Sequence, residues 1–422
     1  MTVGTYRAVF RAPGSAAYCA AGFIMRLPVA IYPIALILIV SAHTGQYGFA
    51  GVLAGVYVAA NGIGNPVLAR MADRFGQRRT LLPACLTHTV ATVGLALAIH
   101  AGMQRWALVA VTAICGFSYL AVGSLVRARW SNSWGNAPEL GTAFSLESTL
   151  DEVIFTTGPL IATAVATGID PVLALLLGVT LVAGGGIWLY RQPGSEPPPN
   201  PRDPSAERTR SAVRAPGMVL ITVGCIAMGA LFASVDVTIV AFCSEQGHRS
   251  WTGAVLACVA IGSGVAGFFY GTRSHPTSPL RRFRSQAVAL GILPVLLPLS
   301  PGIAVLAPAA FVVGLGVAPT LITASELIQR IVDRSVLTEG LAWLVTGLNL
   351  GYGAGSALVG HIADAYGARS GFFVAVAAGV LVAVAAVLVH ARVALPPQPL
   401  ASRPAHRHGT TAQAPDVPCQ GA

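Results

Sequence analysis

The sequence ARMADRFGQRRTLL, residues 69–82, places four arginines and an aspartate between two apolar runs. The flanking runs, 47–69 and 80–102, are long enough to cross a bilayer core of about 30 Å, because a helix needs roughly 20 residues to do so. Two such helices need a tight turn between them, and Gly76 has the backbone freedom for one. The stretch therefore predicts a helical hairpin in a membrane, with a basic turn on one side.

Composition extends this interpretation to the whole chain of 422 residues, of which 54% are hydrophobic and 10% charged. Soluble domains carry about 25% charged residues. So apolar a surface needs lipid as its solvent, and we expect an all-α membrane protein. Twelve apolar runs predict twelve transmembrane helices, at 17–42, 47–69, 80–102, 105–126, 143–168, 170–190, 216–243, 251–271, 285–301, 302–325, 338–362 and 370–391.

The arginines set the expected orientation. The chain has 26 basic residues, all arginine, and 22 of them fall on one side if both termini are cytoplasmic. Arg105, Arg249 and Arg369 fall outside, and Arg26 falls within a helix. This asymmetry follows the positive-inside rule, and it explains the net charge of +10 without a nucleic-acid partner.

A segment rich in proline, serine and charge divides the helices six and six. Such composition favours a poorly ordered linker, here on the cytoplasmic side. The halves echo each other weakly, since Gly158-Pro159 and Gly355-Ser356 occupy corresponding places in the fifth and eleventh runs. Parallel repeats of this kind occur in transporters and predict two pseudo-symmetric six-helix bundles. The expected divisions are a first bundle at 1–191, the linker at 192–215, a second bundle at 216–392 and a disordered cytoplasmic tail at 393–422.

The basic turn resembles the signature loop of the major facilitator superfamily, G-x-L-A-D-R-x-G-R-K-x-x-L. Four residues match this pattern, namely Asp73, Arg74, Gly76 and Arg78, whereas Ala69 and Gln77 depart from it. The resemblance implies a bacterial transporter of the twelve-helix type. It also implies that this loop locks the first half to the start of the eleventh helix and favours the outward-open state.

A second resemblance lies in the fifth run, where TTGPLIAT is similar to the antiporter motif of the same superfamily, G-x-x-x-G-P-x-x-G-G. Only Gly158 and Pro159 match, but this pair bends and thins a helix and so favours close packing. Many drug–proton antiporters of the superfamily carry an arginine in the fourth helix, and Thr112 stands near that place here. The departure weakens the expectation of a standard drug–proton antiporter.

Arg26 is the residue whose place in the first helix most needs explaining. It lies about 14 Å into the membrane at about 1.5 Å per residue, where a lone arginine costs about 2.5–3.5 kcal/mol. The fifth helix runs in the same direction and carries Asp151 at a similar depth, beside Glu152. In the superfamily fold these two helices are neighbours, so we expect Arg26 to pair with Asp151 or Glu152. Glu147 shares a face with Asp151 because the two are four residues apart.

Two acids and one arginine leave one negative charge in excess, which favours a carboxylate that holds a proton. The cluster of Arg26, Glu147, Asp151 and Glu152 is therefore a candidate site for proton coupling or substrate contact. Two alternatives stay open: a purely structural ion pair, or a later helix start that leaves the acids at the cytoplasmic interface. Asp236, near the expected outer mouth of the seventh helix, is a further candidate for loading protons or substrate.

The function expected from these features is secondary active transport of a small, partly hydrophobic organic solute by alternating access across the bacterial inner membrane. Proton-coupled efflux is the first interpretation, proton-coupled uptake of a metabolite the second, and a receptor without turnover the third. The cavity should be lined by helices 1, 4, 5, 7, 8, 10 and 11. No nucleophile–base pair or metal-ligand spacing is visible, so we expect no enzyme, cofactor or metal. The expected partners are the solute, protons and lipid, with the chain acting as a monomer.

Overall fold

The structure, a computed structural model, describes residues 8–135, 137, 139–199, 212–272, 277–332 and 337–393. These residues form helices and no strands. The predicted tail from residue 394 on, and residues 200–211 of the predicted linker, lie outside the described residues. The helices of the N-terminal half are α2 (Ser15–Arg26), α3 (Pro28–Thr44), α4 (Tyr47–Phe75), α5 (Gln77–His100), α6 (Arg105–Ser118), α7 (Val122–Trp134), α8 (Glu139–Gly168) and α9 (Pro171–Tyr190).

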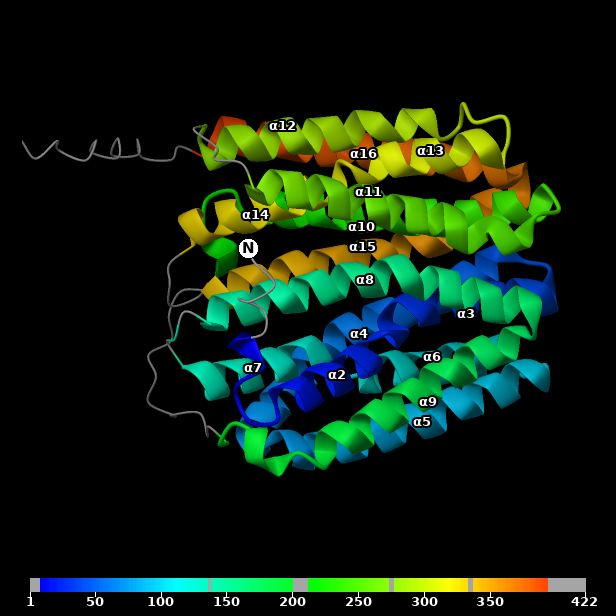
Figure 1. Cartoon of the computed structure of the whole chain (residues 1–422). Coiled ribbons are helices and arrows are strands. Elements are labelled where there is room, and N and C mark those ends of the chain that lie inside the picture. Colours follow the sequence, from blue (N-terminus) through cyan, green and yellow to red (C-terminus); the bar gives the residue numbers. More distant parts are fainter. Residues whose placement is uncertain are drawn as a thin grey trace, which may run out of the picture.

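A second group of helices forms the C-terminal half, which fills the upper part of Figure 1. Two of its segments, α12 and η4, follow one another as a short α-helix and a 3-10 turn. The helices of this half are α10 (Met218–Glu245), α11 (Thr252–Thr272), α12 (Pro279–Ile292), η4 (Leu293–Leu296), α13 (Ile303–Gly314), α14 (Val317–Ile331), α15 (Leu337–Tyr366) and α16 (Ala368–Arg392).

Nine spans in the described part of the chain are long and apolar enough to cross a membrane. Three further helical segments, α8, α12 with η4, and α15, coincide with the other three predicted runs. Their composition makes these three segments less apolar than the nine spans. α8 carries four acidic residues, α12 has three arginines in its first turns, and α15 is rich in glycine. All twelve predicted runs thus correspond to helical segments.

Three spans are broken near their middle, at α2–α3, α6–α7 and α13–α14. At the first break, Pro28 has no N–H to donate, and the Tyr119 hydroxyl donates to the Met25 and Arg26 carbonyls at 3.0 and 3.3 Å. At the second, the Asn61 amide donates to the Gly116 and Tyr119 carbonyls at 3.3 and 2.9 Å. Irregular backbone is tolerated at membrane depth only where other groups satisfy it in this way.

The two halves repeat one packing contact. A Cβ on Gly158 of α8 would lie 2.5 Å from the Ala30 Cβ of α3, and a Cβ on Gly355 of α15 would lie 2.6 Å from the Ala230 Cα of α10. Glycine therefore allows each helix to approach its neighbour closely. The correspondence between Gly158 and Gly355, predicted from the sequence, is confirmed by these equivalent contacts.

Both ends of the molecule can be followed in Figure 1. The start of the described chain and the end of α9, where the linker begins, lie at the left, which we call the linker end. The opposite end, which holds the connections near residues 45, 248 and 367, is called the far end. Across the boundary between the halves, α4 packs on α15 and α8 packs on α11.

The first residues of the predicted linker are ordered. Arg129, fully buried in α7, donates to the Gln192 carbonyl at 3.0 Å and to the Ser195 hydroxyl at 2.7 Å. Glu196 accepts a hydrogen bond of 3.0 Å from the backbone N–H of Arg78. The expectation of a poorly ordered linker from residue 192 is therefore wrong for residues 192–196.

Candidate functional site

A cavity of about 460 Å³ lies between the two halves. Its walls come from α3, α4 and α8 on one side and from α10, α11, α13, α14 and α15 on the other. Most of the lining is apolar, and the principal polar lining residues are Asn61, Glu152, Asp236, Asn349 and Tyr352. Concave, mainly apolar sites with a few polar groups are typical of small-molecule binding.

The helices that line the cavity differ from the prediction at one point. The second span contributes through Tyr57, Val58 and Asn61 of α4, whereas no residue of the fourth span, α6–α7, is among the lining residues described. The reason is local, because α4 crosses the boundary between the halves to pack on α15 and α6 packs behind α4. The expected contribution of the fourth helix is wrong, and the second helix takes its place.

Glu152 brings an acid into the cavity from α8. Its side chain is exposed, and its Oε2 atom would lie 3.4 Å from a Cβ on Gly264 of α11, so it faces the C-terminal half. Within the described residues its carboxylate makes no hydrogen bond or ion pair. The alternative that Arg26 pairs with Glu152 is therefore wrong.

Asp236 is the second acid of the cavity and comes from α10. It accepts a hydrogen bond of 2.8 Å from the Tyr352 hydroxyl of α15. The expected position near the outer mouth is wrong, since Asp236 lines the central cavity nine residues before α10 ends at Glu245. At about 1.5 Å per residue, that is about 14 Å from the far end of the helix.

Arg26 pairs with two acids of α8. Its Nη1 donates to Asp151 at 2.8 Å, its Nη2 donates to Glu147, and its Nε donates to the Gly22 carbonyl at 3.2 Å. Arg26 and Glu147 are buried, and Asp151 is partly exposed. The predicted pairing with Asp151 is confirmed, and Glu147 joins it.

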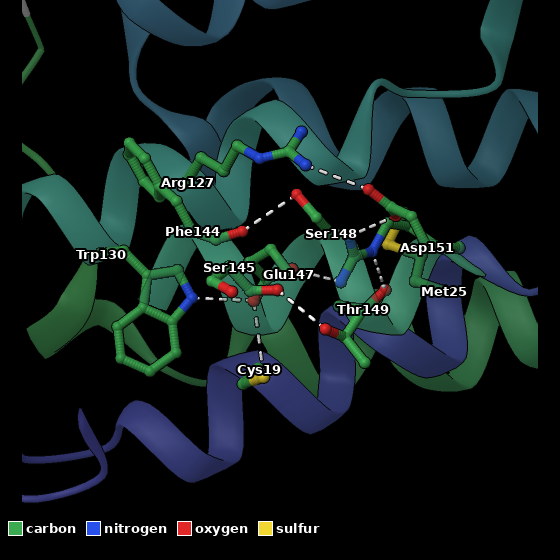
Figure 2. Close-up of polar contacts among 12 residues, drawn as sticks. Cys19, Met25, Arg127, Trp130, Phe144, Ser145, Glu147, Ser148, Thr149 and Asp151 are labelled. Atoms are coloured by element: carbon green, nitrogen blue, oxygen red, sulfur yellow. Dashed lines mark hydrogen bonds and ion pairs between the residues drawn. The ribbon is translucent and has the colours of Figure 1, made fainter. Parts of the chain in front are cut away.

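Glu147 also lies between the Trp130 indole and the Cys19 thiol, as Figure 2 shows. The Trp130 Nε1 atom donates to it at 2.8 Å, and the Cys19 Sγ atom donates at 3.5 Å. A buried carboxylate is tolerated only when it is paired and hydrogen-bonded, and Glu147 meets both conditions. The three helices α2, α7 and α8 are thereby tied together within the N-terminal half.

The predicted charge surplus is wrong, because a second arginine completes the cluster. Arg127 of α7 donates to Asp151 at 3.0 Å, so two arginines face two acids. The sequence argument missed Arg127 because its helix was expected to end near residue 126 and α7 continues to Trp134. The cluster of Arg26, Arg127, Glu147 and Asp151, called the ion cluster below, is balanced.

The far end of the cavity is sealed by close contacts between the halves. The Asp364 carboxylate of α15 accepts from the backbone N–H groups of Tyr47 and Gly48 at 2.7 and 2.6 Å, at the N-terminus of α4. The Ser356 hydroxyl donates to the Gly51 carbonyl at 2.8 Å. A Cβ on Gly51 would lie only 2.1 Å from the Ser356 carbonyl oxygen, so backbone meets backbone here.

Arg249 adds a second connection at the far end. Its Nη2 atom donates to the Leu38 carbonyl at 2.6 Å and to the Ser41 hydroxyl at 2.7 Å, both on α3. The seal therefore involves the first two spans of one half and, in the other half, α15 and the connection between α10 and α11. It closes the cavity on that side.

Comparison with known proteins decides the family. Residues 18–336 match the family model described as Major Facilitator Superfamily. The chain belongs to the major facilitator superfamily. No curated protein sequence matches it.

Solved structures of this superfamily share the fold at low sequence identity. The nucleoside transporter NupG superposes with a TM-score of 0.68 at 13% identity, over 90% of this chain and 98% of its own. An auto-inhibited POT family peptide transporter gives 0.66 at 14% identity, over 92% and 98%. The human organic anion transporter MFSD10 gives 0.63 at 14% identity, over 89% and 100%. The chain is accordingly a multi-pass membrane transporter of the major facilitator superfamily type, not an enzyme.

The signature loop of the superfamily adopts its expected turn, but among the described residues Asp73 makes no contact with the start of α15. Gly76 has a φ of 97° and connects α4 to α5. Asp73 and Arg74 are exposed, and within the described chain Asp73 makes no hydrogen bond or ion pair. The Arg78 guanidinium stacks over the Tyr190 ring at 4.3 Å. The implied lock to the start of α15 is therefore absent from the described contacts in this conformation.

Gln77, the departure from the signature pattern, has a structural role that the sequence did not reveal. It is buried, accepts a hydrogen bond of 2.8 Å from Arg129 and donates to the Leu125 carbonyl at 3.1 Å. Arg129 in turn binds the ordered start of the linker. The only sequence signal for this contact was a polar residue where the superfamily pattern has a basic one.

Two remaining residue groups behave as expected from packing. His88 is fully buried between the Cys115 carbonyl and the Tyr32 hydroxyl, each at 2.9 Å, so both of its ring nitrogens have a partner. Gly158 and Pro159 pack α8 closely, since the Pro159 carbonyl oxygen would lie 2.7 Å from a Cβ on Gly253 of α11. In the described part of the chain, no group of His, Cys, Asp and Glu residues is arranged to hold a metal ion.

Proposed function

We propose that this transporter exports a small, partly hydrophobic organic solute by alternating access, in exchange for protons. The observation that carries the proposal is the cavity of about 460 Å³ between the halves, closed at the far end and lined by Glu152 and Asp236. A mainly apolar wall with two carboxylates suits a partly hydrophobic solute and a titratable carrier. Each chain encloses a complete cavity, so the proposed unit is a monomer that needs no nucleic-acid partner.

The arginine distribution supports the proposed orientation. Arg70, Arg74, Arg78 and Arg79 lie around the turn at the linker end, where both described termini also lie. By the positive-inside rule the linker end is cytoplasmic, and the proposed location is the inner membrane of a bacterium. The sealed far end then faces outward, and the structure corresponds to an inward-facing state.

Protons are proposed to be carried by Asp236 and Glu152, since these acids meet the cavity. Asp236 has Tyr352 as its polar neighbour, and Glu152 has Asp151 beside it in the chain and Gly264 opposite. Arg26, Glu147 and Asp151 are balanced by Arg127 and are proposed to position α8. The ion cluster is thus proposed to be the structural ion pair that the sequence left open as an alternative, and proton binding is proposed for the neighbouring Glu152.

Export is the proposed direction because Gly158 and Pro159 reproduce part of the antiporter pattern. The test compares extracellular metabolites of source strains that lack the protein, overproduce it or carry Asp236→Asn. An exported solute falls in the medium of the deletion and Asp236→Asn strains and rises on overproduction. A solute that is instead depleted from the medium by overproduction contradicts export and indicates uptake.

Proton coupling is tested with that solute in vesicles that contain the purified protein and a pH-sensitive dye. When the solute is added to vesicles whose interior is more acidic than the medium, protons should leave the vesicles that contain the wild type. They should not leave vesicles that contain Asp236→Asn or Glu152→Gln. Asp170→Asn is the matched control, because Asp170 caps α9 at the far end by accepting from the Val172 N–H at 2.7 Å. Solute movement that does not respond to the pH gradient would contradict coupling.

A further inference from the structure

The cavity is negatively charged, and this selects among solutes. Its described lining includes two carboxylates, Glu152 and Asp236, and no arginine, lysine or histidine. Arg26 of α2 and Arg127 of α7, which face α8 beside Glu152, are occupied by Glu147 and Asp151. An anion that enters such a mainly apolar space finds no compensating charge, whereas a cation finds an acid.

Glu152 and Asp236 differ in whether their carboxylates already have a hydrogen-bond partner. Asp236 already accepts a hydrogen bond from Tyr352, whose ring closes that side of the cavity. Glu152 lies exposed against the bare backbone of Gly264, and no described side chain donates to it. A carboxylate beside an apolar wall is stable only with a cation or a proton as partner. Glu152 is therefore the acid that is open to a ligand.

Aromatic rings line the same cavity as Glu152. Phe155 is one helical turn further along α8, on the same face, and 51% of its surface is exposed. Phe232 of α10 and Tyr57 of α4 line the cavity from the other helices. Ring faces attract organic cations, and more strongly where water is excluded. The same rings accept an apolar body.

We infer that the transported solute is an organic monocation, whose charged head lies beside Glu152 and whose apolar body lies against Phe155 and Phe232. One open carboxylate balances one positive charge, which favours a monocation over a dication. A volume of about 460 Å³ falls within the range of small-molecule sites. The inference rests on the proposed function in one respect, that the central cavity is the transport site.

Binding to the purified full chain in detergent tests the inference, with three probes that share a 3-phenylpropyl body. One carries a trimethylammonium head, one a neutral dimethylamide and one a sulfonate. The ammonium probe should bind at least tenfold more tightly than the other two, measured by isothermal titration. Tenfold corresponds to about 1.4 kcal/mol.

Substitutions then locate the preference. Glu152→Gln should lower the affinity for the ammonium probe at least tenfold and leave the amide probe unchanged, whereas Glu152→Asp should keep the preference for the cation. Asp170→Asn should bind all three probes as the wild type does, and thermal unfolding checks that each variant is folded. Equal or tighter binding of the amide or sulfonate, no binding of any probe, or an undiminished preference in Glu152→Gln overturns the inference.

These outcomes are separable from those of the proposed function. Loss of the pH-gradient response in vesicles contradicts proton coupling and leaves the cation preference standing. Preference for the amide or sulfonate in detergent contradicts the cation and leaves coupled export of another solute standing.

Discussion

Replacing Arg26 with methionine removes the central cation of the ion cluster and should destabilise the N-terminal half strongly. The guanidinium makes three hydrogen bonds, to Glu147, to Asp151 and to the Gly22 carbonyl. Side-chain exposure is 7% for Arg26 and 0% for Glu147, so the variant leaves a carboxylate buried without its cation. Breaking a buried pair in this way costs about 3–5 kcal/mol.

Arg127→Met provides the matched comparison, because Arg127 binds the same Asp151 from a more exposed position. The side chains of Arg127 and Asp151 are 39% and 34% exposed, and an exposed pair contributes about 0–1 kcal/mol. Reversible unfolding by a denaturing detergent, followed by tryptophan fluorescence, gives the free energy of unfolding of both variants. Arg26→Met should therefore lower the free energy of unfolding several times as much as Arg127→Met does.

A double substitution tests whether charge, rather than lost packing, causes the effect. Arg26→Met with Glu147→Gln removes one charge of each sign and leaves Asp151 paired with Arg127. The double variant should recover part of the loss of Arg26→Met, with a coupling of about 1–3 kcal/mol. Equal losses in Arg26→Met and Arg127→Met, or no coupling with Glu147→Gln, would refute the reasoning.

Three further predictions concern the seal, the linker and the histidine. Gly51→Ala, whose Cβ would lie 2.1 Å from the Ser356 carbonyl oxygen, should force α4 and α15 apart at the far end and lower solute export. Gly94→Ala, whose Cβ would meet nothing within 4 Å, should leave export unchanged. Arg129→Met should lower the free energy of unfolding by about 3 kcal/mol, because Gln77 and the Ser195 hydroxyl lose a buried charged partner. The control Arg79→Met, at an exposed position, should change the free energy of unfolding by no more than about 0.5 kcal/mol. His88→Leu should lower the free energy of unfolding by about 1–3 kcal/mol, because the Tyr32 hydroxyl and the Cys115 carbonyl lose their hydrogen-bond partner. The same variant should leave the solute concentration for half-maximal export unchanged.

The fold was predictable because membrane helices can be recognised in a sequence by their length and apolar composition. The basic turn with Asp73, Arg74, Gly76 and Arg78 then pointed to the family. The limits of individual helices were less predictable, because arginine and tryptophan side chains can be buried within the protein. Val122–Trp134 continues past the expected end of its run, and this extension hid Arg127 and Arg129 from the sequence argument.

The site was predictable only in part, since partners depend on which way each side chain points. The pairing of Arg26 with Asp151 followed from equal depth on adjacent helices and is confirmed. Glu152 is the next residue, and one step along a helix turns the side chain by about 100°, away from the ion cluster and into the cavity. Depth alone does not distinguish these two acids, whereas the packing of α8 against α3 and α11 does.

The placement of charges also bears on how the halves can move. The ion cluster lies within the N-terminal half, and Arg282–Glu326, with an N–O distance of 2.9 Å, lies within the C-terminal half. The five hydrogen bonds named at the far end instead join the halves, and they involve backbone groups, hydroxyls and one charged side chain at a time. The four bonds made by Asp364 and Arg249 involve a charged group and contribute about 1.5–3 kcal/mol each, and the Ser356 bond contributes about 0.5–1.5 kcal/mol, so together they hold the seal by roughly 6.5–13.5 kcal/mol.

A differential of about 5.5 kcal/mol moves a two-state equilibrium from 1:99 to 99:1. The seal alone exceeds this differential, so a solute or proton can open it only together with contacts that form in the opposite state. It is strong enough to hold the cavity closed at the far end when nothing opposes it. The ion cluster, by contrast, need not break during the exchange, because all of its residues belong to the N-terminal half. We propose that the exposed Asp73 at the linker end forms compensating contacts in the opposite state, so that the transition would exchange one set of hydrogen bonds for another without unpairing the buried charges of the ion cluster.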